Sequence, residues 1–301
     1  MDTFEVGATA AGVRLDAYLA QTLGCSRAEA RRVLARGVVR VGGQRRSVAE
    51  KGERLAAGAR VEVERFVSAD ALRPIAEPEL ALPILAEGPG WLVVDKPAGM
   101  PVHPLREEER GSALGFVAAR HPEIVGVGER GLRSGVVHRL DIETSGALAF
   151  AHAPDAWAAL REAFRRHTME KAYRAIALGE LAGEGTLELP MVVAQHRPAR
   201  VRVAEGGHRV VLAWRALEAL HGATLVEVRP VTGFLHQIRA AFAHLGHPLA
   251  GDVRYGSEAA GDPSGAARAM LHASFLAGAG VRAAAPDPTD FAAALARLRL
   301  G

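Results

Sequence analysis

Apolar residues near the start of the chain recur at the spacing of a helix face. Leucine occupies every fourth position from 15 to 23, which predicts an amphipathic helix there. Ser26 precedes Glu29 by three positions, a capping box that predicts the start of a second helix over residues 27–36. A valine-rich run then leads to Gly42-Gly43, a two-residue hairpin signal. The pattern predicts two helices followed by a hairpin.

The rest of the chain contains several strand patterns and one clear helix pattern. Residues 91–95 and 170–178 have the apolar content and alternation of strands. A helix is predicted over residues 156–167, because apolar side chains recur there on one face. Two further apolar runs, at 136–137 and 147–151, flank a polar turn and predict two short buried strands.

The turn between those two predicted strands carries an acid and a base. If residues 136–141 are extended, Arg139 and Asp141 lie on one face, and His138 and Leu140 lie on the other. Ionised residues are rarely placed in apolar surroundings without a partner or a function. For an arbitrary Arg-x-Asp pattern, a structural ion pair at a strand end is the simpler interpretation.

Composition narrows the class of protein. The chain has 301 residues, 49% of them hydrophobic and 24% charged, as in ordinary soluble globular proteins. The single cysteine, Cys25, excludes an internal disulfide and suits a reducing compartment. No apolar run approaches the ~20 residues needed to span a bilayer, and the acidic start lacks the regions of a signal peptide. We therefore expect a cytoplasmic protein without a membrane partner.

Positive charge is concentrated at the N-terminus. Residues 1–66 hold 12 Lys or Arg against 8 Asp or Glu, a net of +4, whereas the remainder holds 25 against 26, a net of −1. Seven arginines and one acid lie between residues 26 and 46, and Arg27, Arg31 and Arg32 belong to the second predicted helix. A solvated helix face is one interpretation. Arginine dominates over lysine, however, and its planar fork suits phosphate oxygens, so these three residues are candidates to bind a partner that carries phosphate groups.

The sequence HRLDIETSG, residues 138–146, resembles the HRLD-x-x-TSG motif of the Rlu-type RNA pseudouridine synthases. Seven of nine positions match, which is far more specific than a charge pair. By this resemblance Asp141 is the catalytic aspartate. Arg139 beside it is a candidate to fill the gap that a flipped nucleotide leaves in the RNA.

Two further segments resemble motifs of the same family. The first, KPAGMPVHP at residues 96–104, is predicted to be a stiff loop. Its resemblance to the family motif implies that it supports the cleft, and Lys96 and His103 are candidate RNA contacts. The second, EKAYRA at residues 170–175, resembles the motif whose tyrosine packs against the target uracil. Tyr173 is therefore expected to stack on a flipped base, although a lone tyrosine is usually a half-buried core residue.

The segment TGFLHQIR, residues 232–239, resembles the family pattern T-G-R-x-H-Q-[IL]-R. Its last arginine, Arg239, is expected to pair with Asp141 and to keep it ionised and oriented. Phe234 stands where the family usually has arginine, and Leu235 also departs from the pattern. These two changes put substrate affinity or identity in question. Three histidines, His236, His244 and His247, lack structural-zinc spacing, so no metal site is expected there.

The N-terminal segment, with RLDAYL at 14–19, SRAEARRVL at 26–34 and GVVRVGG at 37–43, resembles the S-four-like RNA-binding domain. This resemblance implies that Arg27, Arg31 and Arg32 bind RNA. With the family fold, it also implies an α+β protein: a small S-four-like α/β RNA-binding domain over 1–66, a linker over 67–80, and a catalytic domain over 81–301. The resemblance implies a mixed, mainly antiparallel sheet with a central cleft in the larger domain.

The implied reaction needs no cofactor, because converting uridine to pseudouridine adds no atoms or electrons. The G-x-G-x-x-G match at 126–131 lacks a preceding strand, and a strand pattern rather than a helix follows it, so a dinucleotide site is not expected. Glycoside hydrolysis normally uses two carboxyl groups in defined roles. Glu143 is the only second carboxyl group near Asp141 in the sequence, at a position that the family motif leaves free, so hydrolysis is less favoured.

The expected partner is structured RNA, with ribosomal RNA favoured over transfer RNA, and no protein partner is implied. The alternative is an RNA-binding or assembly factor whose enzyme site has decayed, which only Phe234 and Leu235 support. The presence of Asp141, Tyr173 and Arg239 favours the enzyme. Whether the aspartate attacks the sugar carbon, stabilises it or removes a neighbouring proton stays open.

Overall fold

The computed structural model describes residues 1–64, 67, 69–196, 198–258 and 261–300. The chain forms two compact units, each with its own core. One unit comprises Met1–Arg73 with Arg130–Leu132, and the other comprises Pro74–Glu129 with Arg133–Gly301. The division after Arg73 falls inside the segment 67–80 that the sequence assigns to a linker.

The N-terminal unit is a small α/β fold with the predicted helix–helix–hairpin order. Its described strands form an antiparallel sheet in the order β1-β4-β2-β3. Gly42 and Gly43 both have positive φ, 56° and 77°, as the tight turn between β2 and β3 requires. Its elements are β1 (Asp2–Glu5), α1 (Leu15–Thr22), α2 (Arg27–Ala35), β2 (Val39–Val41), β3 (Gln44–Arg46) and β4 (Arg60–Val63).

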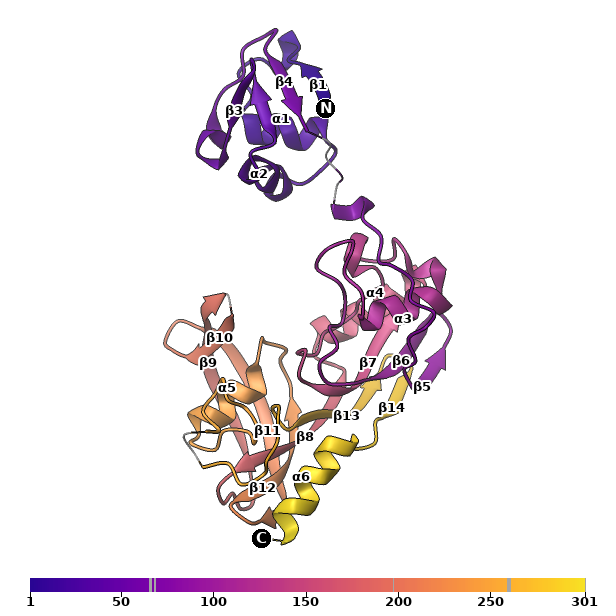
Figure 1. The fold of residues 1–301 in the computed structure, drawn as a ribbon, viewed down its shortest axis with the longest axis vertical. Coiled ribbons are helices and arrows are strands. Elements are labelled where there is room, and N and C mark those ends of the chain that lie inside the picture. The colour runs from indigo at the N-terminus through magenta and orange to yellow at the C-terminus, as the bar shows by residue number, and fades with distance from the viewer. Residues whose placement is uncertain (65–66, 68, 197, 259–260, 301) are drawn as a thin grey trace. The chain divides into compact units, whose positions relative to one another are not determined.

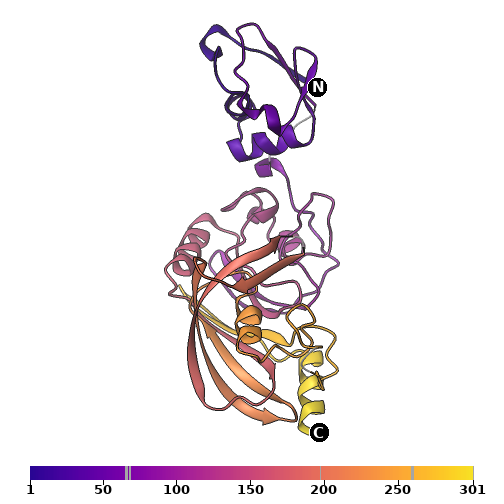
Figure 2. The same cartoon turned by 90° about the vertical axis from the view of Figure 1, so that its left-hand side faces the viewer.

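The larger unit is built on one twisted sheet, which Figures 1 and 2 show from two sides. Among the described residues its path is β10-β9-β11-β12-β8-β13-β7-β6-β5, and β14 pairs with β13. The strands are β5 (Ile84–Gly88), β6 (Trp91–Lys96), β7 (Ser145–Ala151), β8 (Glu170–Leu178), β9 (Glu184–His196), β10 (Ala199–Val203), β11 (His208–Leu220), β12 (Ala223–Pro230), β13 (Leu271–Gly278) and β14 (Val281–Ala284). The helices are α3 (Ala113–Arg120), α4 (Pro154–Arg165), α5 (Gln237–His244) and α6 (Thr289–Leu300). Every strand pair on this path except β13–β7 is antiparallel, so the predicted α+β class is confirmed.

Alternating side chains let a helix pack on each face of the β6–β7 half of the sheet. Leu92 and Val94 of β6 belong to the core cluster that contains Phe116 of α3. Val93, between them, belongs instead to the cluster that contains Leu160 of α4. This follows from the period of two along a strand, which sends neighbouring side chains to opposite faces.

The β8–β12 half of the sheet repeats this arrangement with the other two helices. Ala175 of β8 packs in the cluster of Phe242 from α5, whereas Ile176 packs in the cluster of Phe291 from α6. Figure 1 shows α6, in yellow, beside the lower ends of these strands. The core cluster that contains α3 residues and the core cluster that contains α5 residues both pack against the partly buried Tyr173 of β8.

The two halves meet at a short parallel pairing of β7 with β13, where His272 opposes Ser145 and Ala273 opposes Gly146. Gly146 has φ of +113°, and a Cβ there would lie 2.2 Å from the carbonyl oxygen of Ala273. Only glycine allows this close approach of the two backbones. The glycine of the HRLDIETSG motif therefore joins the halves of the sheet.

The prediction of a short strand at residues 136–137 is wrong. Val136 makes only an isolated bridge to Phe150, and residues 137–141 are irregular. The backbone acceptors are used by α4 instead: Trp157 Nε1 donates to Val136 O at 3.1 Å, and Arg161 Nη1 donates to Val137 O at 3.0 Å. These side-chain donors satisfy the two carbonyls without a strand ladder.

In the part of the chain that the structure describes, no helix is both long and apolar enough to cross a membrane.

Candidate active site

The loop that carries Asp141 is fixed through its backbone. The buried ammonium of Lys96 donates to Ile142 O at 3.1 Å, and Gly99 N donates to the same oxygen at 2.8 Å. Arg268 Nη1 donates to Glu143 O at 3.0 Å. These contacts hold the main chain of the two residues that follow Asp141, while 22% of the Asp141 side chain stays exposed.

One buried guanidinium, that of Arg239 in α5, faces three carboxylates. Its Nε and Nη2 donate to the two oxygens of Asp252 at 2.6 and 2.7 Å, a bidentate pair. Nη2 also lies 3.0 Å from Glu143 Oε2, and Nη1 lies 3.7 Å from Asp141 Oδ2. Burial lowers the pKa of Arg239, but the hydrogen bonds and charges of the carboxylates outweigh it and raise this pKa. Arg239 is therefore a permanent cation beside Asp141.

Tyr173 lies where the core clusters of α3 and α5 meet, in the middle of the sheet. Burial raises the pKa of its phenol, and the negative charge of Asp141 raises this pKa further. The tyrosine is therefore within electrostatic reach of the aspartate and stays protonated at neutral pH. The structure thus brings Asp141, Tyr173 and Arg239 together from a loop, a strand and a helix.

A second tyrosine supports the guanidinium. The ring of Tyr255 lies 5.3 Å from Arg239 Cζ, within the range of a cation–π contact. Its hydroxyl accepts from Val201 N at 2.9 Å and lies 3.0 Å from His236 Nδ1. His236 stands before α5 in the left-handed conformation, with φ of +49°. It is a hydrogen-bonding residue of the site.

Residues 90–244, about half of the chain, match the family model for RNA pseudouridylate synthase. The chain belongs to this family. An uncharacterised RNA pseudouridine synthase of Mycobacterium bovis is 33% identical and covers 96% of this chain and 95% of its own length. Ribosomal large subunit pseudouridine synthase D of Xanthomonas campestris is 32% identical, with 97% of this chain and 90% of that protein covered. The solved structure of human RNA pseudouridylate synthase domain containing 1 shares the fold, with a TM-score of 0.57, 24% identity and coverage of 75% of this chain and 87% of that one.

The sequence prediction of an Rlu-type pseudouridine synthase, an isomerase that acts on RNA, is thereby confirmed. The assignment of the N-terminal unit as an S-four-like domain and the roles of individual residues stay predictions.

Lys96 does not fit its predicted role as an RNA contact. Its side chain is fully buried, and its Nζ donates to Pro97 O, Met100 O and Ile142 O at 2.9, 2.8 and 3.1 Å. Burial, together with the charge of Arg268, lowers the pKa of Lys96 to about 7. Three acceptors engage three N–H donors only in the ammonium form. Lys96 therefore ties the KPAGMPVHP loop to the loop of Asp141.

His103 and Arg139 have different surroundings. His103 is nearly buried, with Nδ1 2.9 Å from Pro104 O, and burial lowers its pKa. The positive charge of Arg139 is among the groups that lower this pKa further, so the two side chains are neighbours. Arg139 itself is exposed and therefore accessible to RNA. The accessible RNA candidate of this pair is Arg139.

The predicted RNA contacts of the N-terminal unit surround a buried acid. Arg31 Nε and Nη2 donate to Asp16 Oδ2 at 3.2 and 3.1 Å, and Arg27 Nη2 lies 3.6 Å from Asp16 Oδ1. The side chains of Arg27 and Arg31 are still 55% and 47% exposed, and Arg32 is exposed as well. Asp16, which no sequence pattern singles out, therefore positions Arg27 and Arg31.

Three residues of the site are not predicted as site residues by the sequence patterns: Glu143, Asp252 and Tyr255. The tail pattern of His247-Pro248, Gly251-Asp252 and Tyr255-Gly256 was the available signal for two of them. Phe234, the departure from the motif, packs against the α5 cluster and lies 5.3 Å, ring to ring, from His208. Phe234 therefore contributes apolar packing at a position where the family usually has a charged arginine.

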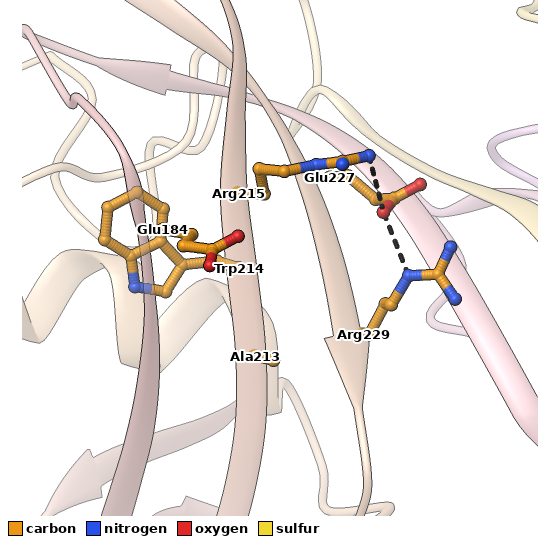
Figure 3. A pocket seen from close by; sticks show the side chains of 6 residues that line it. All are labelled: Glu184, Ala213, Trp214, Arg215, Glu227 and Arg229. Atoms are coloured by element: carbon orange, nitrogen blue, oxygen red, sulfur yellow. Dashed lines mark hydrogen bonds and ion pairs between the residues drawn. The ribbon is translucent and has the colours of Figure 1, made fainter.

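A shallow hollow of about 260 Å³ lies away from these residues, on β9, β11 and β12 (Figure 3). Arg215 and Arg229 line it, and both pair with Glu227, at 3.5 and 2.9 Å. Three of the charged side chains that line it are therefore already paired with one another. It does not include the aspartate, tyrosine and arginine described above.

Proposed function

We propose that this protein isomerises specific uridines of large-subunit ribosomal RNA and that Asp141 is its catalytic residue, acting on a nucleotide flipped out of the RNA. The supporting observation is the accessible Asp141 carboxylate, which lies 3.7 Å from the buried, permanently charged Arg239 and raises the pKa of the protonated Tyr173. Ribosomal RNA is favoured because several relatives, including that of Xanthomonas campestris, are named ribosomal large subunit pseudouridine synthase D.

The reaction rearranges one nucleoside. The bond from the ribose C1′ to N1 of uracil breaks, the base turns, and C1′ joins C5. The proton on C5 is lost and N1 gains one, so atoms and electrons balance without a cofactor. The electron-poor C1′ needs a nearby carboxylate, whether this group adds to the carbon, stabilises it or removes a neighbouring proton.

The surrounding side chains supply position and charge. Arg239 uses Nε and Nη2 for Asp252, which leaves Nη1 directed toward Asp141. A carboxylate oriented by a fixed cation avoids reorganisation during the reaction. The backbone contacts from Lys96 and Arg268 restrain the same loop. The aspartate is thus pre-positioned before RNA binds.

Two residues are assigned to the base and to the RNA. The ring of Tyr173 provides a face on which the freed uracil stacks while it rotates. The exposed Arg139, two positions before Asp141, takes the space that the flipped nucleotide leaves. In the N-terminal unit, Arg27, Arg31 and Arg32 bind phosphates, which supply affinity rather than sequence choice.

The test is a comparison of pseudouridine maps of total RNA from cells with and without the gene. We expect the loss of one or a few pseudouridines in large-subunit RNA, restored by the wild-type gene but not by Asp141→Asn. Loss confined to transfer RNA would refute the ribosomal target and leave the enzyme assignment intact. Unchanged maps would contradict the proposed activity in the cell.

A further inference from the structure

Two histidines and a glutamate meet at the surface of the larger unit, apart from the site described above. His121 Nδ1 and His152 Nδ1 lie 3.0 and 2.9 Å from the same oxygen, Glu123 Oε1. The two imidazole rings stack, with centroids 4.0 Å apart and planes inclined by 19°. One potential ligand atom from each residue lies within 4.8 Å of the others.

We propose that His121, Glu123 and His152 bind a divalent transition-metal ion, with zinc as the expected occupant. Two imidazole nitrogens and one carboxylate oxygen form a ligand set that zinc accepts, and water completes the tetrahedron. The site is independent of the proposed function and serves stability rather than catalysis.

The present geometry is close to what an ion requires. With zinc–ligand bonds near 2.0 Å, two ligands of a tetrahedron lie about 3.3 Å apart. The two nitrogen–oxygen distances, 3.0 and 2.9 Å, therefore need to open by about 0.3–0.4 Å each. A rotation of the Glu123 carboxylate supplies this, because 53% of its side chain is exposed.

The three residues come from backbone that is already fixed. His121 ends α3, and Pro122, which restricts the backbone on both sides of itself, separates it from Glu123. Ile124, next in the chain, is fully buried. His152 follows β7 directly, and its backbone N–H donates to Gly90 O at 2.8 Å. Binding an ion therefore orders little more than side chains.

The charge states at neutral pH suit a cation. Hydrogen bonds within the cluster lower the pKa of Glu123, so it is a carboxylate. Burial and the neighbouring His121 lower the pKa of His152, so it is a neutral imidazole. The negative charge of Glu87 has the opposite, smaller effect and raises the pKa of His152. A neutral imidazole can carry its proton on Nε2, which leaves Nδ1 free to bind an ion.

An ion here would join the end of β7 to the turn that follows α3. β7 starts at Ser145, beside the loop of Asp141, and His152 follows its other end. Six residue steps of strand span about 20 Å, so the ion would lie too far away to act on the nucleoside. It would instead stabilise the folded state, since it binds that state and not the unfolded chain.

The test uses the full-length chain without a histidine tag, freed of metal by a chelator. Titration with zinc chloride, followed by calorimetry, should show one equivalent with a Kd below about 100 µM. Zinc at 100 times the Kd should raise Tm by about 5 °C or more. Cobalt(II) should give the visible absorption of a tetrahedral site, and the ring signals of His121 and His152 should shift in NMR spectra.

Glu123→Gln and His152→Asn should each weaken zinc binding at least tenfold, whereas the control His244→Asn, at an exposed histidine of α5, should not. Pseudouridine formation should be equal with and without zinc. The proposal fails if the wild-type Kd exceeds about 100 µM, if Glu123→Gln binds zinc as the wild type does, or if zinc leaves the two ring signals unmoved. The wild-type measurements decide the question even if a variant misfolds.

Discussion

In each unit of this protein a buried charged side chain is surrounded by three side chains of opposite charge, but the signs are exchanged between the units. In the N-terminal unit the buried charge is Asp16, fully inaccessible, and its partners Arg14, Arg27 and Arg31 are 43–55% exposed. In the larger unit the buried charge is Arg239, 3% exposed, and its partners are Asp252, Asp141 and Glu143.

The sign of the buried member determines what the surface presents. A buried acid positions guanidinium groups whose remaining N–H donors face solvent, which suits RNA phosphates. A buried guanidinium positions carboxylates, and Asp252 is fully buried while Asp141 and Glu143 are 22% and 42% exposed. In our proposal the same ion-pair chemistry thus serves RNA binding in one unit and catalysis in the other.

The largest expected effect follows from removing the buried cation. Arg239→Met leaves Asp252 buried without its partner, and breaking such a pair costs about 3–5 kcal/mol of the free energy of unfolding. Isomerisation should fall by about 10³-fold, or about 4 kcal/mol in the barrier. Urea unfolding and single-turnover assays measure the two effects.

Arg31→Met is the matched control in the other unit, because Asp16 keeps two arginines and the lost partner is half exposed. It should cost less than about 1 kcal/mol. Equal stability losses for the two variants would contradict the difference between the units.

An intermediate effect is expected from the exposed arginines of the N-terminal unit. In a plot of log K for RNA association against log salt concentration, replacing Arg27, Arg31 and Arg32 together by Gln should make the negative slope shallower by about 2–3. The reason is that each lost phosphate contact contributes about 0.7–0.9 to the slope. The rate at saturating RNA should be unchanged. Filter binding at several salt concentrations measures the slope.

The control is Arg165→Gln with Arg166→Gln, on α4, where both arginines pair with Glu162. It should leave the slope unchanged within error. A similar loss of slope in the control would show that general positive charge, rather than the surface around Asp16, binds RNA.

The smallest effect concerns acid stability. His138 Nε2 accepts from Ala149 N at 2.9 Å, and burial lowers the pKa of His138 to about 3. Between this value and its ordinary pKa near 6.5 the unfolded chain binds more protons than the folded one, so stability falls as pH falls through that window. His138→Gln, with an acceptor that does not titrate, should lose less stability between pH 7 and pH 4.

Urea unfolding at both pH values measures this difference, with His244→Gln as the control at an exposed histidine. An identical pH dependence in His138→Gln and the wild type would show that His138 is not the acid-sensitive group.

Local patterns predicted the elements whose signals are local. The capping Ser26, which accepts from Glu29 N at 3.2 Å, and the Gly42-Gly43 turn are where the sequence placed them. The strand expected at 136–137 does not form, and side chains of α4, later in the chain, compete for its two carbonyls. No local pattern could reveal that competition.

The candidate site shows the same limit. Asp141, Tyr173 and Arg239 were identified through motifs, and their convergence depends on a sheet whose halves join at Gly146. The burial of Lys96 and the pairing of Arg239 with Asp252 arise only from tertiary packing. In the sequence, a lysine in a proline-rich loop looks exposed, which favours an RNA contact. Its role in holding the loop of Asp141 is visible only in the folded chain.

The most direct test compares the two accessible carboxylates that face Arg239. Asp141→Asn and Glu143→Gln each change one oxygen to nitrogen, so size and packing are preserved. Single-turnover conversion of a uridine-containing target RNA should fall by about 10³-fold or more for Asp141→Asn, with RNA binding retained, and by less than about 10-fold for Glu143→Gln. Pseudouridine formation by Asp141→Asn at the wild-type rate would contradict the role of Asp141 on which the account rests.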